Sequence, residues 1–222
     1  MNPLQRSQLA RLSLQGLSIG DAFGESFFGV RATILQHLEV QTMPSTNWAF
    51  TDDTVMGAVL CRHVVEHQGA VQADQLAAAW ATAHAQDPQR GYGATARRVL
   101  RAIEAGEDWR TIAAAVFDGM GSMGNGAAMR VGPIGAYHWE QPALAAARAA
   151  ASARITHVHA EGVAGAMAVA AAAATAVQIG RGAVQLAPNA YLERVAEQVP
   201  DTDTRAKLLK GRTLSAKTHP DT

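Results

Sequence analysis

Two adjacent aspartates flanked by threonines stand at the head of an apolar stretch. Residues 51 to 54 read TDDT and are followed by VMGAVL. Thr51 is a good helix N-cap, and acidic residues in a first turn complement the helix dipole, so capping alone is one explanation. One cap needs one oxygen, however, whereas this segment offers two carboxylates and two hydroxyls. Clustered hard oxygen donors are what Mg²⁺, Mn²⁺ or Ca²⁺ requires, so the segment from Thr51 to Thr54 is also a candidate metal site.

A glycine-rich segment, FDGMGSMGNGAAMRVGPIG, runs from residue 117 to residue 135. Glycines ahead of a helix let backbone N–H groups approach a phosphate closely, and a helix N-terminus favours an anion. The spacing is not that of a P-loop, and no strand precedes it as a dinucleotide-binding fingerprint demands. The segment is a candidate anion-binding loop, and a flexible connection between helices is the alternative.

Two further clusters carry ionisable groups. His157 and His159, in ITHVHAEG, precede a helix of small residues and could ligate a metal, line an anionic pocket, or serve capping and packing. The HExxH spacing of zinc hydrolases is absent from the sequence. In GDAFGE, Asp21 and Glu25 lie four residues apart on one face of an apolar helix. Because a buried unpaired carboxylate is costly, these two need a metal, a hydrogen-bond donor or an exposed rim.

The elements that must position these residues read as helices. Alanine is abundant and β-branched alternation is nearly absent, which favours helix throughout, with breaks at Gly, Pro and Asp. No repeat period or linker-like shift in composition divides the chain, so we expect one all-α domain over residues 1–222, folded as a compact multi-helix bundle. The expected helices are 4–24, 51–67, 72–86, 92–105, 109–117, 125–137, 142–153, 158–179, 189–198 and 203–212.

Composition limits the classes of partner. The chain has 222 residues, 48% of them apolar, with 19 basic and 19 acidic residues, so no overall positive field favours nucleic acid or anionic lipid. The single cysteine, Cys61, excludes an intrachain disulfide. The N-terminus lacks a signal-peptide core, and the longest apolar run, 163–177, is too short to span a bilayer. We therefore expect a soluble cytoplasmic protein without a membrane or a sequence-specific nucleic-acid partner.

Taken in order, GDAFGE, TDDT, GNGAAMR and THVHAEG resemble the ADP-ribosylglycohydrolase family, of the dinitrogenase-reductase-activating glycohydrolase type. The resemblance covers the chain from Leu14 to about Val177. It implies the all-α orthogonal helix bundle of that family and a binuclear Mg²⁺ or Mn²⁺ centre. It also implies hydrolysis of the glycosidic bond between ADP-ribose and a modified protein side chain or a related small conjugate.

The resemblance also implies roles for individual residues. Thr51, Asp52 and Asp53 correspond to the first half of the metal site, and a carboxylate, Glu25 or Asp53, assists proton transfer. His157 corresponds to a histidine near the ADP-ribose. The segment that holds the distal ribose and diphosphate corresponds to Ser122, Gly124, Asn125 and Gly126.

The sequence departs from the family pattern at two places. Phe28 stands where the family often has a glutamate, and Glu25, a helical neighbour of that position, is expected to reach the same space. The family completes its metal site with a late Asp-x-Asp-Thr element. Residues 201–204 read DTDT, but a Val-Pro pair precedes them and bulky charged residues follow.

We therefore expect Asp201 or Thr202 to cap an ordinary amphipathic helix, and Asp203 to lie in it, rather than to bind a metal. On this reading the chain is C-terminally incomplete and holds one metal ion or none. The alternative to a glycosidase is then a shortened, weak or inactive module that binds ADP-ribose or another nucleotide.

Overall fold

The computed structural model describes residues 2–28, 31–40, 42–43 and 47–214, and every regular element in these ranges is helical. The prediction of an all-α fold is confirmed. The helices are α1 (Pro3–Glu25), α2 (Arg31–Glu39), α3 (Asp52–Glu66), α4 (Ala73–Gln86), α5 (Ala94–Glu104), α6 (Trp109–Ala115), the 3₁₀ turn η1 (Asn125–Ala127), α7 (Gly132–Tyr137), α8 (Pro142–Ala153), α9 (Ala160–Gly180), α10 (Pro188–Ala196) and α11 (Asp203–Gly211).

Two elements differ from the prediction. Helix α2 was not expected, because the residues around it carry no clear apolar period. The single helix expected over 125–137 is instead the turn η1 followed by the short helix α7, since Gly132 and Pro133 begin a new helix there. This break leaves residues 121–131 as an irregular segment in the middle of the fold.

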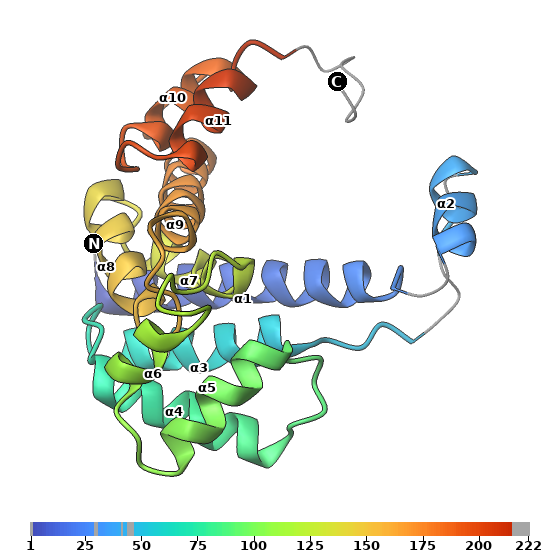
Figure 1. Ribbon diagram of the computed structural model, residues 1–222. Coiled ribbons are helices and arrows are strands. Elements are labelled where there is room, and N and C mark those ends of the chain that lie inside the picture. The colour runs from blue at the N-terminus through green and yellow to red at the C-terminus, as the bar shows by residue number, and fades with distance from the viewer. Residues whose placement is uncertain (1, 29–30, 41, 44–46, 215–222) are drawn as a thin grey trace.

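Long helices of small residues form the centre of the bundle. Helix α9 packs on α7, α8 and α10, while α1 packs on α3 and α7, and α4 packs on α3 and α5. In Figure 1, α3 to α6 lie below α1. Helices α10 and α11 lie at the top of the view, and α2 lies apart from the other helices. The arrangement brings the N-terminus of α3 close to the turns that join α4 to α5 and α6 to α7.

Close approach of α7 and α9 depends on one glycine. A Cβ at Gly135 would lie 2.2 Å from the carbonyl oxygen of Ala170 and 2.7 Å from the Cβ of Ala173. These distances are far below van der Waals contact, so only glycine permits this spacing. Elsewhere in α9, Gly165 meets an ordinary contact of 3.8 Å.

Helix α9 is long and apolar enough to cross a membrane by length and composition alone. However, 56% of its most apolar window is buried inside the fold, against α7, α8 and α10. Its buried face includes Ala164, Ala168, Ala171 and Thr175. Such burial is what a core helix of a bundle requires.

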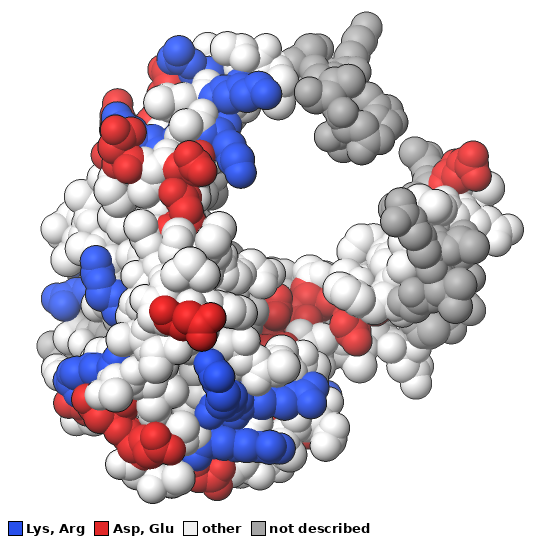
Figure 2. Space-filling model, viewed as in Figure 1, with Lys and Arg blue, Asp and Glu red and all other residues white. Residues whose placement is uncertain are grey.

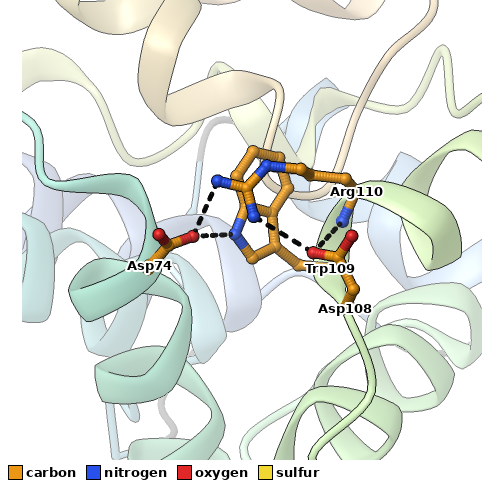
Figure 3. A network of polar contacts seen from close by, with 4 residues as sticks. All are labelled: Asp74, Asp108, Trp109 and Arg110. Atoms are coloured by element: carbon orange, nitrogen blue, oxygen red, sulfur yellow. Dashed lines mark hydrogen bonds and ion pairs between the residues drawn. The ribbon is translucent and has the colours of Figure 1, made fainter.

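A surface network ties α4 to α6 (Figure 3). The carboxylate of Asp74 accepts a hydrogen bond from Trp109 Nε1 at 2.8 Å and pairs with Arg110 at 2.9 Å. The Arg110 guanidinium also pairs with Asp108 at 3.1 Å and lies over the Trp109 ring. Because these groups are exposed, the network orients α6 more than it stabilises the fold.

Candidate active site

The carboxylate of Asp21, near the end of α1, holds the TDDT segment. Its Oδ1 accepts from the Thr51 hydroxyl at 2.7 Å, and its Oδ2 accepts from the Thr51 N–H at 2.8 Å. The same Oδ2 accepts from the N–H and the hydroxyl of Thr54 at 3.1 and 2.5 Å. The sequence left a metal, a hydrogen-bond donor or an exposed rim as possible surroundings for Asp21, and in the structure this carboxylate is bound by hydrogen-bond donors. Four donors on one carboxylate fix the first turn of α3 against α1.

Thr51 is the N-cap of α3, as the capping explanation predicted. Its hydroxyl accepts from the Asp53 N–H at 3.4 Å while donating to Asp21. Asp52 and Asp53 are therefore the first two residues of the helix. The helix dipole and the free N–H groups of this turn favour negative charge there.

The two aspartates of this turn are packed where a charge is costly. Asp52 is only 9% exposed, and burial followed by repulsion from Asp53 raises its pKa to about 6. Burial, Asp21 and Glu25 raise the pKa of Asp53 as well. Figure 2 shows acidic side chains gathered over the C-terminal half of α1, beside the start of α3. A cation bound here would offset this repulsion.

A cavity of about 250 Å³ opens against these aspartates. It is lined by the first turns of α3, by residues within 91–100 and 122–130, and by the residues just before α9. Segments that lie between residues 52 and 157 of the sequence thus share one cavity. The residues predicted for the site that line it are Asp52, Asp53, Ser122, Asn125, Gly126 and His157.

Glycines let the backbone enclose this cavity closely. Gly91 has a φ of +85°, and a Cβ there would touch Thr51 and Asp52 at 3.4 to 3.5 Å. A Cβ at Gly126 would lie 3.0 Å from the His157 ring, and the Gly124 N–H donates to Ser122 Oγ at 3.2 Å. The segment 122–126 therefore lies directly against the histidine, in an ordered turn.

The two histidines before α9 have different roles. His159 is the N-cap of α9, and its Nδ1 accepts from the Glu161 N–H at 3.1 Å. His157 is buried, and its Nδ1 lies 2.8 Å from the hydroxyl of Thr156. Burial, followed by the charge of Arg130, lowers the pKa of His157 to about 4, so the ring is neutral at physiological pH. Of this pair, His157 alone lines the cavity.

Arg130 forms part of the cavity wall without a carboxylate partner among the described residues. It is 1% exposed, lies 3.8 Å over the Trp80 ring, and donates to the Ser152 carbonyl and the Thr156 hydroxyl. Burial lowers its pKa to about 9. A buried guanidinium held by neutral acceptors leaves positive charge at the bottom of the cavity.

Three residues predicted for the site do not line the cavity. The Thr51 hydroxyl is hydrogen-bonded to Asp21. Gly124 directly precedes the lining residue Asn125 but does not itself line the cavity. Glu25 is exposed at the end of α1, close enough to Asp53 to influence its pKa but outside the cavity wall. Phe28, where the family often has a glutamate, is also exposed.

The DTDT segment lies elsewhere. Thr202 is the N-cap of α11, which confirms the prediction of an ordinary helix cap, and Glu161 accepts from the N–H groups of Asp203 and Thr204 at 2.8 and 2.9 Å. Helix α11 packs on α9 and α10, far from α3 in Figure 1. Within the described part of the chain, no group of three or more His, Cys, Asp or Glu side chains could hold a metal ion.

A family comparison bears on this arrangement directly. The model of the ADP-ribosylglycohydrolase family matches residues 2–221, which is nearly the whole chain. The chain belongs to the ADP-ribosylglycohydrolase family. The family resemblance predicted from the four motifs is thereby confirmed.

Individual relatives in this family are similar over about half of the chain. ADP-ribosylhydrolase ARH3 of Xenopus tropicalis is 34% identical over 131 residues, which is 54% of this chain and 37% of the relative. The human protein of the same name is 33% identical over 136 residues, again 54% and 37%, and the Danio rerio protein is 31% identical over 141 residues, 60% and 38%. The matched region thus spans little more than a third of these relatives.

Sequence reasoning missed three features of this cavity and its surroundings. The sequence indicated that the Asp21 carboxylate needs a partner, but it did not predict the hydrogen bonds to Thr51 and Thr54, which lie 30 and 33 positions away. No role at the cavity was predicted for Arg130, which lies within GNGAAMR, or for Gly91. The available signal for Arg130 was a lone arginine between apolar residues with no acid at helical spacing.

Proposed function

We propose that this protein is a metal-dependent hydrolase of the glycosidic bond between ADP-ribose and a modified protein side chain or a small conjugate. Membership of the ADP-ribosylglycohydrolase family and the printed name of the ARH3 relatives support this reaction class. The observation that carries the proposal is the shared cavity, in which Asp52 and Asp53 face the 122–126 segment and His157. An acidic side and a glycine-rich side suit a sugar with an attached diphosphate.

The donor set suits Mg²⁺ or Mn²⁺. Thr51, Asp52 and Asp53 supply a hydroxyl and two carboxylates, which are hard oxygen ligands. Because the Thr51 hydroxyl donates its hydrogen to Asp21, an oxygen lone pair stays available for a cation. The raised pKa values of both aspartates indicate negative charge that a divalent ion would offset. When bound, such an ion would polarise a water molecule and orient the ribose hydroxyls.

The residues of the chain then have distinct tasks. The N–H groups and Ser122 hydroxyl of the 122–126 segment bind diphosphate or ribose oxygens, and His157 donates a hydrogen bond beside them. Of the two candidate carboxylates, Asp53 lines the cavity and Glu25 does not, so Asp53 takes a proton from the attacking water. The water oxygen forms a bond to the anomeric carbon while the bond between the anomeric carbon and the side-chain nitrogen or oxygen breaks. A proton is then returned to that leaving atom.

Release of ADP-ribose from an ADP-ribosylated protein tests the proposal. We expect release in Mn²⁺ or Mg²⁺, loss of release in EDTA, and loss in the Asp52→Asn plus Asp53→Asn variant. Asp201→Asn, which changes an exposed aspartate outside the cavity, is the matched control and should keep full release. Turnover that persists in the double variant would disprove a role for these carboxylates.

A second candidate is a module that binds ADP-ribose without cleaving it. The observation that supports this candidate is that no group of three or more His, Cys, Asp or Glu side chains among the described residues could hold a metal ion. Titration calorimetry with ADP-ribose, followed by product analysis after long incubation, separates the two. Binding in the cavity with no product from a conjugate would support the module.

A further inference from the structure

Three buried polar side chains form a hydrogen-bonded chain along the cavity wall. Arg130 Nη2 lies 2.9 Å from Thr156 Oγ1, which in turn lies 2.8 Å from His157 Nδ1. The exposed fractions of the three side chains are 1%, 5% and 8%. All three residues line the cavity, and Thr156 connects the His157 ring to the Arg130 guanidinium.

The hydrogens in this chain have one arrangement that satisfies every group. A guanidinium can only donate, so Thr156 Oγ1 accepts from Arg130. The hydroxyl must then donate its own hydrogen, and within the described residues the acceptor in contact is His157 Nδ1. If Nδ1 carried a proton, the buried hydroxyl hydrogen would lack an acceptor, which costs about 1–3 kcal/mol. The neutral ring therefore holds its proton on Nε2.

The geometry around His157 directs that Nε2–H toward the glycine-rich segment. A Cβ at Gly126 would lie 3.3 Å from Nε2, and a Cβ at Gly124 would lie 3.7 Å from it. Both His157 and Gly126 line the cavity. The absence of a side chain at these two positions keeps the Nε2–H open to a ligand atom.

We propose that Arg130 and Thr156 are positioning residues that fix His157 as a neutral Nε2–H donor, aimed at an oxygen acceptor of ADP-ribose in the cavity. The identity of the ligand rests on the proposed function; the tautomer does not. A ring that donates through Nε2 and accepts through Nδ1 has no free lone pair. His157 therefore acts neither as a metal ligand nor as a general base.

Nitrogen-15 NMR of the histidine rings in the free, full-length protein tests the tautomer. The His157 signals are assigned by their loss in His157→Gln. At pH 7 we expect Nδ1 to be unprotonated and Nε2 to be protonated. A proton on Nδ1, or on both nitrogens, would overturn the proposal.

Two substitutions test the origin of the tautomer. Thr156→Val removes the hydroxyl at nearly constant shape and should give a mixture of tautomers, with ADP-ribose affinity weakened about tenfold. Thr156→Ser keeps the hydroxyl and should behave as the wild type. Thr175→Val, which removes a buried hydroxyl bonded to the Ala171 carbonyl within α9, is the matched control. A single Nε2–H tautomer in Thr156→Val would also overturn the proposal.

The two readouts separate the possible failures. The tautomer is measured without a ligand, so it decides the role of Arg130 and Thr156 by itself. The response of the Nε2 signal to added ADP-ribose decides whether ADP-ribose, the ligand that the proposed function requires, binds beside His157. A protein with the expected tautomer and no response to ADP-ribose would support the positioning role and disprove ADP-ribose as the ligand.

Discussion

Asp52 lies nearly buried in the first turn of α3, with Asp53 beside it and Asp21 below. Its pKa is about 6 in the folded protein, against 3.8 for an ordinary aspartate, chiefly because burial disfavours the charge. Between these values the folded state holds a proton that the unfolded state has lost. Stability therefore falls as the pH rises from about 4 to about 6, and it stays reduced at neutral pH.

Replacing this charge should stabilise the free protein. We expect Asp52→Asn to raise the free energy of unfolding, and the gain should be about 2 kcal/mol larger at pH 7.5 than at pH 4.5, since one pKa unit corresponds to about 1.4 kcal/mol. Urea denaturation of both proteins at the two pH values, without divalent ions, measures the difference. A gain of equal size at both pH values would contradict a strained Asp52 carboxylate.

Helix α3 begins where it does because a carboxylate from α1 closes its first turn. Asp21 accepts four hydrogen bonds from Thr51 and Thr54 at the start of α3. Glu161 likewise accepts three hydrogen bonds from Asp203 and Thr204 at the start of α11, so each carboxylate clamps the first turn of a helix. The two clamps differ in what they position. The first holds the cavity aspartates, whereas the second holds a helix remote from them.

Asp21→Asn should destabilise the fold, because an amide presents its own N–H groups to a cluster of donors. We expect a loss on the order of 2–4 kcal/mol in the free energy of unfolding, together with weaker Mn²⁺ binding measured by calorimetry. Glu161→Gln is the matched control, since it should lower stability but leave the Mn²⁺ affinity unchanged. Equal loss of Mn²⁺ affinity in both variants would show that Asp21 acts through global stability alone.

The contact between α7 and α9 gives a second test at the level of elements. Gly135→Ala places a methyl group 2.2 Å from the Ala170 carbonyl oxygen, so the helices must separate, and we expect a loss of about 1–3 kcal/mol or more. Gly165→Ala in α9 meets only an ordinary contact and improves helix propensity, so it should be neutral or stabilising by up to about 1 kcal/mol. Thermal unfolding of the pair checks this, and similar midpoints would refute close packing at Gly135.

Local signals explain what the sequence revealed about these elements. Gly, Pro and Asp breaks predicted most helices, because they end helices through backbone geometry that needs no partner. The cap at Thr202 was predictable for the same reason. The hydrogen bonds of Asp21 to Thr51 and Thr54 and the burial of Arg130 were not predictable, because each depends on contacts between distant segments. Helix α2 gave no periodic signal at all.

At the scale of the whole molecule, the bundle brings an acidic helix start and a glycine-rich turn into the lining of one cavity. The motif order had suggested this meeting only through family resemblance; spacing alone could not place residues 52 and 126 together. Arg130, buried under the cavity, adds positive charge on the side where a diphosphate would lie. The formal net charge of zero is thus compatible with an anionic ligand, since the charges that matter are local.

The affinity for ADP-ribose with and without Mn²⁺ tests most directly whether this cavity is one metal-linked site. If the aspartates hold a cation against the ligand, each must strengthen the binding of the other. Calorimetry on the wild type should therefore show tighter ADP-ribose binding in Mn²⁺ than in EDTA, and the Asp52→Asn plus Asp53→Asn variant should show no such difference. An identical Mn²⁺ effect in the double variant, or no binding of ADP-ribose by the wild type, would contradict the account.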